Sequence, residues 1–186
     1  AVLAAVGAID GESAEGAQLR AVASALGPAV EAARDGMDRF FHLLRDFVAA
    51  QANGGMLSEQ RLRLTRGLRA QPDWSNVEVG WEAAFEPLRA VDGALATLEQ
   101  DLQAAGEPFE ELRADVEALR GSIAQTSEQA GTLLLHHDAA TVVWLFVNGR
   151  SGEVSVNAAP LRVDDILQSE LFSRRRSVIL TGATLC

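Results

Sequence analysis

Apolar residues recur every three to four positions through the first part of this chain, and this periodicity constrains the fold more than any other feature. Such spacing places the side chains on one face of an α-helix, which turns once in about 3.6 residues. The first stripe ends at the turn-forming run Asn53-Gly54-Gly55. Its members are Leu19, Val22, Leu26, Val30, Ala33, Met37, Phe41, Leu44 and Val48. The sequence therefore predicts a mainly α protein.

Two local signals divide this helical region further. Gly27-Pro28 interrupts the first stripe and predicts a kink or break, because a proline removes a helix hydrogen bond and clashes with the preceding turn. A second helix is predicted from about Ser58, a suitable N-terminal cap, to about Ala70, with Pro72 closing it.

The next stretch has the pattern of two helices joined by a short turn. Leu88, Leu95 and Leu102 lie seven residues apart, and the pattern resumes after Gly106-Glu107-Pro108. Two heptad-patterned helices with so short a connection are expected to lie antiparallel, over residues 80–104 and 108–131. The remaining apolar positions are Val91, Leu98, Leu112, Val116, Leu119, Ile123 and Ala130. They are interpreted as helical core rather than as a cofactor site.

The period of the pattern changes after residue 140. Residues 141–147 are rich in β-branched and aromatic side chains, Asn148-Gly149 is a turn signal, and residues 153–157 alternate polar with apolar. This combination predicts a β-hairpin. Residues 163–172 then predict a short amphipathic helix with acidic residues in its first turn.

The expected fold class is thus mainly α, with a helix hairpin, a small β-hairpin and a final apolar strand that begins at Ser177. Helix is expected throughout the chain before residue 138, and strand mostly after residue 140. We expect two parts, a helical domain over residues 1–140 and a second unit over residues 141–186.

Charge is distributed unevenly along the chain, whose net charge is −10. Residues 1–140 carry 11 arginines against 22 acidic residues, whereas residues 141–186 carry 5 arginines against 4. An acidic first part repels phosphate overall, so any contact with nucleic acid must be local.

Two features of the sequence bear on cellular location. The single cysteine, Cys186, can close no disulfide within the chain and fits a cytoplasmic protein. No apolar run is long enough to cross a membrane, and residues 1–9 lack the basic flank of a signal peptide.

The end of the chain carries its most specific motif. Residues 177–180 are mostly apolar and lead directly into Thr181, Gly182, Ala183, Thr184 and Leu185. Upstream stand Trp144 in an apolar strand, Ala159-Pro160-Leu161, and an amphipathic segment that ends in Glu170-Leu171-Phe172.

This order resembles the DNA helicases of the DinG/XPD type in superfamily two, in which a core strand ends in motif III, close to Thr-Ser-Ala-Thr-Leu. The resemblance is specific over residues 141–186 and only architectural before them. It implies a helical Arch-type domain followed by a β-hairpin and a strand that returns to the first motor domain. Gly182 stands where the family often has serine, so a role for that hydroxyl does not carry over.

The resemblance also implies an activity and a set of ligands. The full-length parent would be an ATP-dependent DNA helicase that uses ATP and Mg²⁺, binds single-stranded DNA and translocates 5′ to 3′. Thr181 and Thr184 would couple nucleotide state to the grip on DNA. Relatives often hold an iron–sulfur cluster upstream of this region, and some are fused to a nuclease; this sequence decides neither point.

Catalytic motifs of such a motor are absent from the chain itself. It has no Gly-x-x-x-x-Gly-Lys-[Ser/Thr] loop, no lysine at all, and no Asp-Glu-Ala-His box. In the family that box precedes the Arch insertion and motif III follows it. The chain is therefore expected to be a segment between the two, unable to hydrolyse ATP and binding no cofactor itself.

Candidate nucleic-acid contacts are two sets of arginines. On the predicted helix over residues 58–70, Arg63, Arg66 and Arg69 spread over the face opposite Leu64 and Leu68, where they could meet phosphate or form salt bridges with nearby acids. Near the C-terminus, Arg174, Arg175 and Arg176 pose the same choice between a phosphate contact and a helix C-terminal counter-charge.

His136-His137-Asp138 contains residue types that bind metals, but it has no spaced partner. An exposed helix end is the favoured interpretation, and no metal site is expected. The competing hypothesis for the whole chain is a free-standing helical scaffold that binds a protein partner or dimerises through its heptad hairpin.

Overall fold

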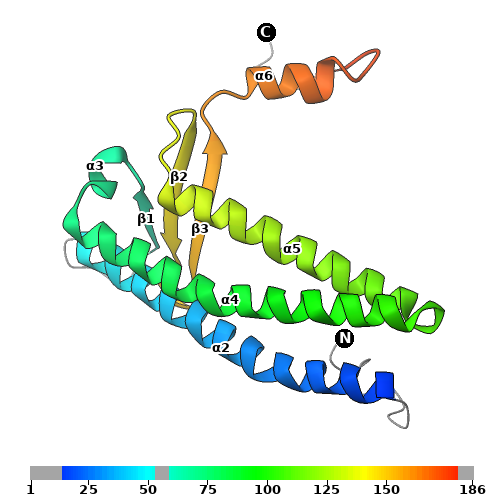
Figure 1. The fold of residues 1–186 in the computed structure, drawn as a ribbon. Helices are drawn as coiled ribbons and strands as arrows, with labels where there is room; N and C mark the ends of the chain where they lie inside the picture. The colour runs from blue at the N-terminus through cyan, green and yellow to red at the C-terminus, as the bar shows by residue number, and fades with distance from the viewer. Residues whose placement is uncertain (1–13, 53–58, 180–186) are drawn as a thin grey trace.

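Three long helices lying side by side form the body of the protein in the computed structural model, which describes residues 14–52 and 59–179 (Figure 1). They are α2 (Ala14–Gln51), α4 (Pro72–Ala105) and α5 (Glu110–Leu135). A short helix α3 (Arg66–Arg69) precedes α4, and a 3₁₀ turn η1 (Glu107–Phe109) precedes α5. The expected mainly α fold with a small β-hairpin is confirmed.

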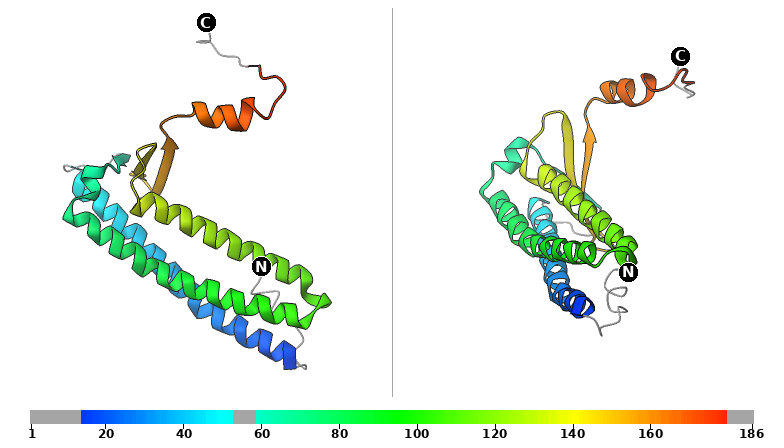
Figure 2. Two further views of the ribbon diagram at one scale, coloured as in Figure 1. Left: turned by 45° about the horizontal axis from the view of Figure 1, so that its top comes forward. Right: turned by 45° about the vertical axis from the view of Figure 1, so that its right-hand side comes forward.

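α4 and α5 form the expected antiparallel hairpin (Figures 1 and 2). Gly106 ends α4 with a φ of 83°, a left-handed value that favours glycine, and its N–H donates to the Leu102 carbonyl. Both helices extend further toward the sheet than the sequence pattern indicated, α4 at its N-terminus and α5 at its C-terminus.

The apolar periodicity of the sequence did not indicate that α2 packs along α4. The two helices approach closely where a Cβ at Gly36 would lie 3.5 Å from the backbone of Ala84, and Gly80 faces Leu43 from the other side. Small residues at such points let helix axes come together, so the apolar stripe of α2 meets α4 rather than solvent.

A three-stranded antiparallel sheet stands at one end of the bundle. Its strands are β1 (Gln60–Arg63), β2 (Thr141–Val147) and β3 (Val154–Pro160), with β2 in the centre. β2 and β3 are the expected hairpin. β1, which precedes the α4–α5 hairpin in the sequence, pairs with the other edge of β2.

The core has two parts. One lies where the sheet meets the helices and is built around Trp74, Leu44, Leu134 and Leu145, all almost fully buried. The other lies further along the helices, and its buried members are Leu26, Ala33, Val91, Leu95, Leu98, Leu102 and Val116.

Two features of the first half of the chain differ from expectation. The break that the sequence offered at Pro28, as the alternative to a kink, is absent: α2 runs through the proline, with Leu26 and Ala33 buried on either side of it. The helix predicted over residues 58–70 is largely replaced by strand β1, and only α3 is helical there. The edge of β2 offers backbone partners, and the Leu64 N–H donates to the Val143 carbonyl at 2.9 Å.

Beyond the sheet the chain leaves the bundle. α6 (Asp164–Ile166) continues as a π-helical turn η2 (Leu167–Phe172), which confirms the short helix predicted there. Residues 177–179, where a strand was expected to begin, are not in a strand. The rest of the expected strand lies outside the described residues, as does the first part of the segment predicted to start at Ser58.

Candidate nucleic-acid interface

The sheet has one buried face and one partly exposed face. Val143, Leu145 and Val147 of β2 point inward and join the core with α2 and α4. The intervening residues Trp144 and Phe146 point to the other face and remain partly exposed, as the alternation of side chains along a strand requires.

Strand register places arginines beside these two rings. Arg61 pairs with Phe146 and Arg63 with Trp144 across β1 and β2, so all four side chains share the outer face. The Arg61 guanidinium lies 5.6 Å from the centre of the Phe146 ring, within the range of a cation–π contact.

The third strand completes the same two rows. Ser155 pairs with Phe146, and Asn157 pairs with Trp144. The Asn157 Nδ2 donates to Ser155 Oγ at 2.9 Å, which places both polar groups on this face beside the rings. The outer face thus has arginine on one side, aromatic rings in the middle and hydrogen-bonding groups on the other.

The sequence interpretation identified only part of this surface. Arg63 was expected to lie on a helix but belongs to β1, beside Trp144. Arg61 and Phe146 were not singled out as site residues. The local signal there is the alternation of Arg and Leu from Arg61 to Leu64, which has the period of a strand but covers only four residues.

Arg69 is engaged inside the fold. Its guanidinium donates to the backbone carbonyls of Leu133, at 2.6 Å, and of Leu134, and it lies 5.3 Å from the Trp74 ring. Burial lowers the pKa of this guanidinium, partly offset by Glu78, although arginine still stays protonated at neutral pH. Arg69 therefore caps the end of α5, whereas Arg66 of the same short helix is exposed.

The second set of arginines lies on the segment that leaves the bundle. Arg174, Arg175 and Arg176 follow η2 and are exposed. Arg174 forms an ion pair with Glu170 at 3.0 Å, one helical turn earlier. The structure does not bring this triplet together with Arg63 or Arg66, and Thr181, Gly182, Ala183, Thr184 and Leu185 lie outside the described residues.

His136 and His137 follow the last residue of α5 and are exposed, as expected. The Asp138 carboxylate accepts hydrogen bonds from the Thr141 hydroxyl at 2.7 Å and from the Ala140 N–H, which lowers its pKa. It thereby organises the turn into β2. Within residues 14–52 and 59–179, no three potential ligands gather in a way that could hold a metal ion.

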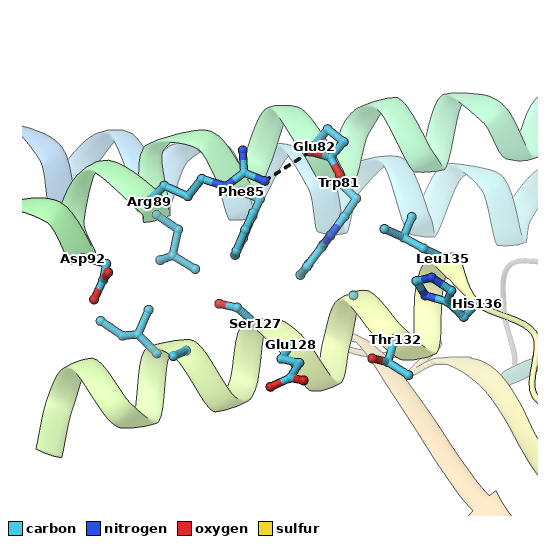
Figure 3. A pocket seen from close by; sticks show the side chains of 14 residues that line it. Trp81, Glu82, Phe85, Arg89, Asp92, Ser127, Glu128, Thr132, Leu135 and His136 are labelled. Atoms are coloured by element: carbon cyan, nitrogen blue, oxygen red, sulfur yellow. Dashed lines mark ion pairs between the residues drawn. The ribbon is translucent and has the colours of Figure 1, made fainter.

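A groove of about 490 Å³ runs between α4 and α5 (Figure 3). Trp81 and Phe85 stack on its α4 side, with ring centres 5.7 Å apart. Its α5 side includes the small residues Ala124, Ser127 and Gly131, and a Cβ at Gly131 would lie 3.6 Å from the Trp81 indole nitrogen. Large rings facing small side chains leave the space open.

Charged groups border this groove. Glu82, Asp92 and Glu128 lie along it, against the single arginine Arg89, which pairs with Glu82 at 3.6 Å. Arg120 ties the two helices together at one end through Asp92, at 3.0 Å, and Glu99, at 2.7 Å, and these contacts raise its pKa. The lining of the groove therefore has more carboxylates than arginines, and two of the carboxylates, Glu82 and Asp92, are ion-paired.

No described helix combines the length and apolar character that a membrane span requires. Comparisons of the chain with protein-family models, curated proteins and solved structures find no significant match.

Proposed function

We propose that this chain is a region of an ATP-dependent DNA helicase similar to DinG and XPD. The region runs from the Arch domain to motif III and helps to enclose single-stranded DNA as the motor translocates 5′ to 3′. The observation that carries the proposal is the segment after β3, which leaves the bundle and exposes apolar side chains (Figure 1).

The exposed apolar side chains of that segment are typical of a protein–protein interface. Six of the segment's large apolar residues are exposed by 39% to 89%, although the chain has two well-packed cores elsewhere; Leu171 and Val178 are partly buried. The six exposed residues are Leu161, Val163, Ile166, Leu167, Phe172 and Ile179. Contiguous apolar exposure of this kind marks an interface with another protein surface. A first motor domain, into which the resemblance leads this segment, would supply such a surface.

Within the proposed helicase, ATP and Mg²⁺ bind to motor residues upstream of this chain. Thr181 and Thr184 would serve coupling between nucleotide state and DNA grip, while the helical bundle would stand over the DNA path. The proposed location is cytoplasmic.

The motif is tested by replacing both threonines with valine in the full-length parent. Valine keeps the shape of a strand residue but removes the two hydroxyls. ATP binding should survive, whereas base pairs unwound per ATP hydrolysed should fall. Normal unwinding by this double variant would refute the coupling role.

The absence of ATP-hydrolysis motifs from this sequence gives a second test. The isolated 186-residue chain should show no DNA-stimulated ATP hydrolysis, because it has no lysine to contact the phosphates. Turnover that survives repurification would contradict the proposal. A parent gene without a phosphate loop and an Asp-Glu-Ala-His box upstream would contradict it as well.

The α4–α5 groove favours the second candidate function, a scaffold that binds a protein partner. The rings of Trp81 and Phe85 and the carboxylates that line the groove suit an amphipathic helix with basic flanks. Gly131→Leu would fill the groove, whereas Gly121→Leu makes the same change on α5 where a Cβ meets nothing within 4 Å. A synthetic Leu/Arg amphipathic 18-mer should lose affinity only for the first variant; equal binding to both would exclude this function.

A further inference from the structure

We infer that the outer face of the sheet is a stacking site for single-stranded nucleic acid. Bases would stack on Trp144 and Phe146 while Arg61 and Arg63 meet the phosphates. This inference rests on the proposed function in its choice of ligand, but it assigns the contact to a surface that the helicase resemblance does not identify.

Geometry of the two rings fits successive bases. They occupy alternate positions of the central strand, so their attachment points lie about 7 Å apart on one face. Every base has a flat face, so a pair of aromatic side chains on a sheet can bind single strands without reading their sequence. Paired bases in a duplex are already stacked and cannot reach such rings.

No described helix competes for this face. The inward residues of the sheet, including Leu62, Leu145 and Val156, belong to the hydrophobic core, whereas Trp144 and Phe146 belong to neither core cluster. Aromatic rings left partly exposed at the centre of a sheet, and not at its edge, are thus available to a ligand.

The strands themselves are basic within an acidic chain. The chain has 26 acidic residues, yet the three strands contain none, while β1 contributes two arginines; the nearest acids in sequence are Glu59 before β1 and Glu153 before β3. Arg61 and Arg63 are exposed, and among the described residues no carboxylate pairs with either. Phosphate contacts here would displace counterions without first breaking an ion pair.

Polar groups on β3 complete the site. Ser155 and Asn157 lie beside the two rings on the side opposite the arginines. Their hydroxyl and amide could donate to base edges or sugar oxygens, so a strand crossing the sheet would meet phosphate, ring and hydrogen-bonding contacts in turn.

The test measures binding of fluorescein-labelled dT15 to the 186-residue chain by anisotropy at several salt concentrations. Trp144→Leu and Phe146→Leu remove the rings but keep apolar side chains on the sheet. Each should weaken binding by at least about fivefold. Arg61→Gln with Arg63→Gln should also weaken binding and reduce the salt slope of log K by about 1.4.

Matched controls separate the site from general effects. Phe41→Ala removes an aromatic ring that is 40% exposed on α2, and Arg34→Gln with Arg39→Gln removes the same charge from that helix. Neither control should change affinity by more than about twofold. Circular dichroism melts establish whether each variant is folded. If a ring variant fails to fold, the double variant of Arg61 and Arg63 still tests the site.

Several outcomes would overturn the inference. They are a chain that binds no dT15 at low salt, duplex DNA bound as tightly as dT15, and ring variants that bind like the controls. U15 should bind within a few-fold of dT15, because stacking does not require the sugar to be deoxyribose, and a complete preference for either would contradict the stacking mode. If the full-length parent unwinds DNA, and its Trp144→Leu and Phe146→Leu variants unwind DNA equally well, this site is refuted while the proposed helicase function stands.

Discussion

Arg69 offers the sharpest test of how the bundle end is held together. Arg69→Met keeps most of the apolar stem but removes the guanidinium that donates to the carbonyls of Leu133 and Leu134. The lost contacts are two hydrogen bonds from a charged donor, each worth about 1.5–3 kcal/mol, and a cation–π contact to Trp74 worth about 0.5–1 kcal/mol.

Two effects reduce this sum. Both acceptors are uncharged carbonyls at a helix end, so we take the lower value for each bond. The Arg69 Nε is buried without a partner, and its removal returns about 1 kcal/mol. We therefore expect Arg69→Met to lower the free energy of unfolding by about 2.5–3 kcal/mol, which is about 5–12 °C in Tm for a chain of this size.

Urea unfolding followed by circular dichroism measures this change. Arg66→Met is the matched control, because Arg66 lies on the same short helix and is exposed. Arg69→Lys keeps the charge without the planar fork and should give an intermediate loss. If Arg69→Met and Arg66→Met differ by less than about 0.5 kcal/mol, the capping argument fails.

Three smaller predictions concern local structure. Thr65→Ala removes the side-chain cap of α3 and should cost about 1 kcal/mol in urea unfolding. Gly93→Ala, at a helical position where a Cβ meets nothing within 4 Å, should stabilise the chain by about 1 kcal/mol, whereas Gly106→Ala at φ 83° should destabilise it in the same assay. NMR titration should give Asp138 a pKa below the ordinary value of about 3.9, and Thr141→Val should raise it toward that value. Because the folded pKa is lowered, the stability that this group contributes is present above its unfolded pKa and is lost as pH falls through the folded pKa.

The long helices were predictable because their burial follows a simple period. Leu95 and Leu102 are buried where the heptad pattern placed them. The break offered at Pro28 does not occur, since contacts with another helix can outweigh a local preference that sequence patterns measure alone.

Strand β1 and the outer face of the sheet were not predicted from the sequence, for a different reason. A four-residue strand has too few positions for its alternation to stand out, and its partner Val147 is remote in sequence. Arg63 was therefore identified by residue type but placed in the wrong element, and its neighbour Trp144 could not be linked to it. Similarly, nothing local to Arg69 indicates that it reaches the end of α5.

Pairing of β1 with β2 also sets the order in which this chain can fold. Gln60 meets Val147 only after the α4–α5 hairpin has reversed the chain between them, so the sheet closes a long loop. During synthesis β1 leaves the ribosome well before its partner exists, whereas the helices need only nearby contacts. The face that carries Arg61, Arg63, Trp144 and Phe146 is therefore expected to form late in folding, and a chain halted before β2 has the two arginines without the rings that they lie beside.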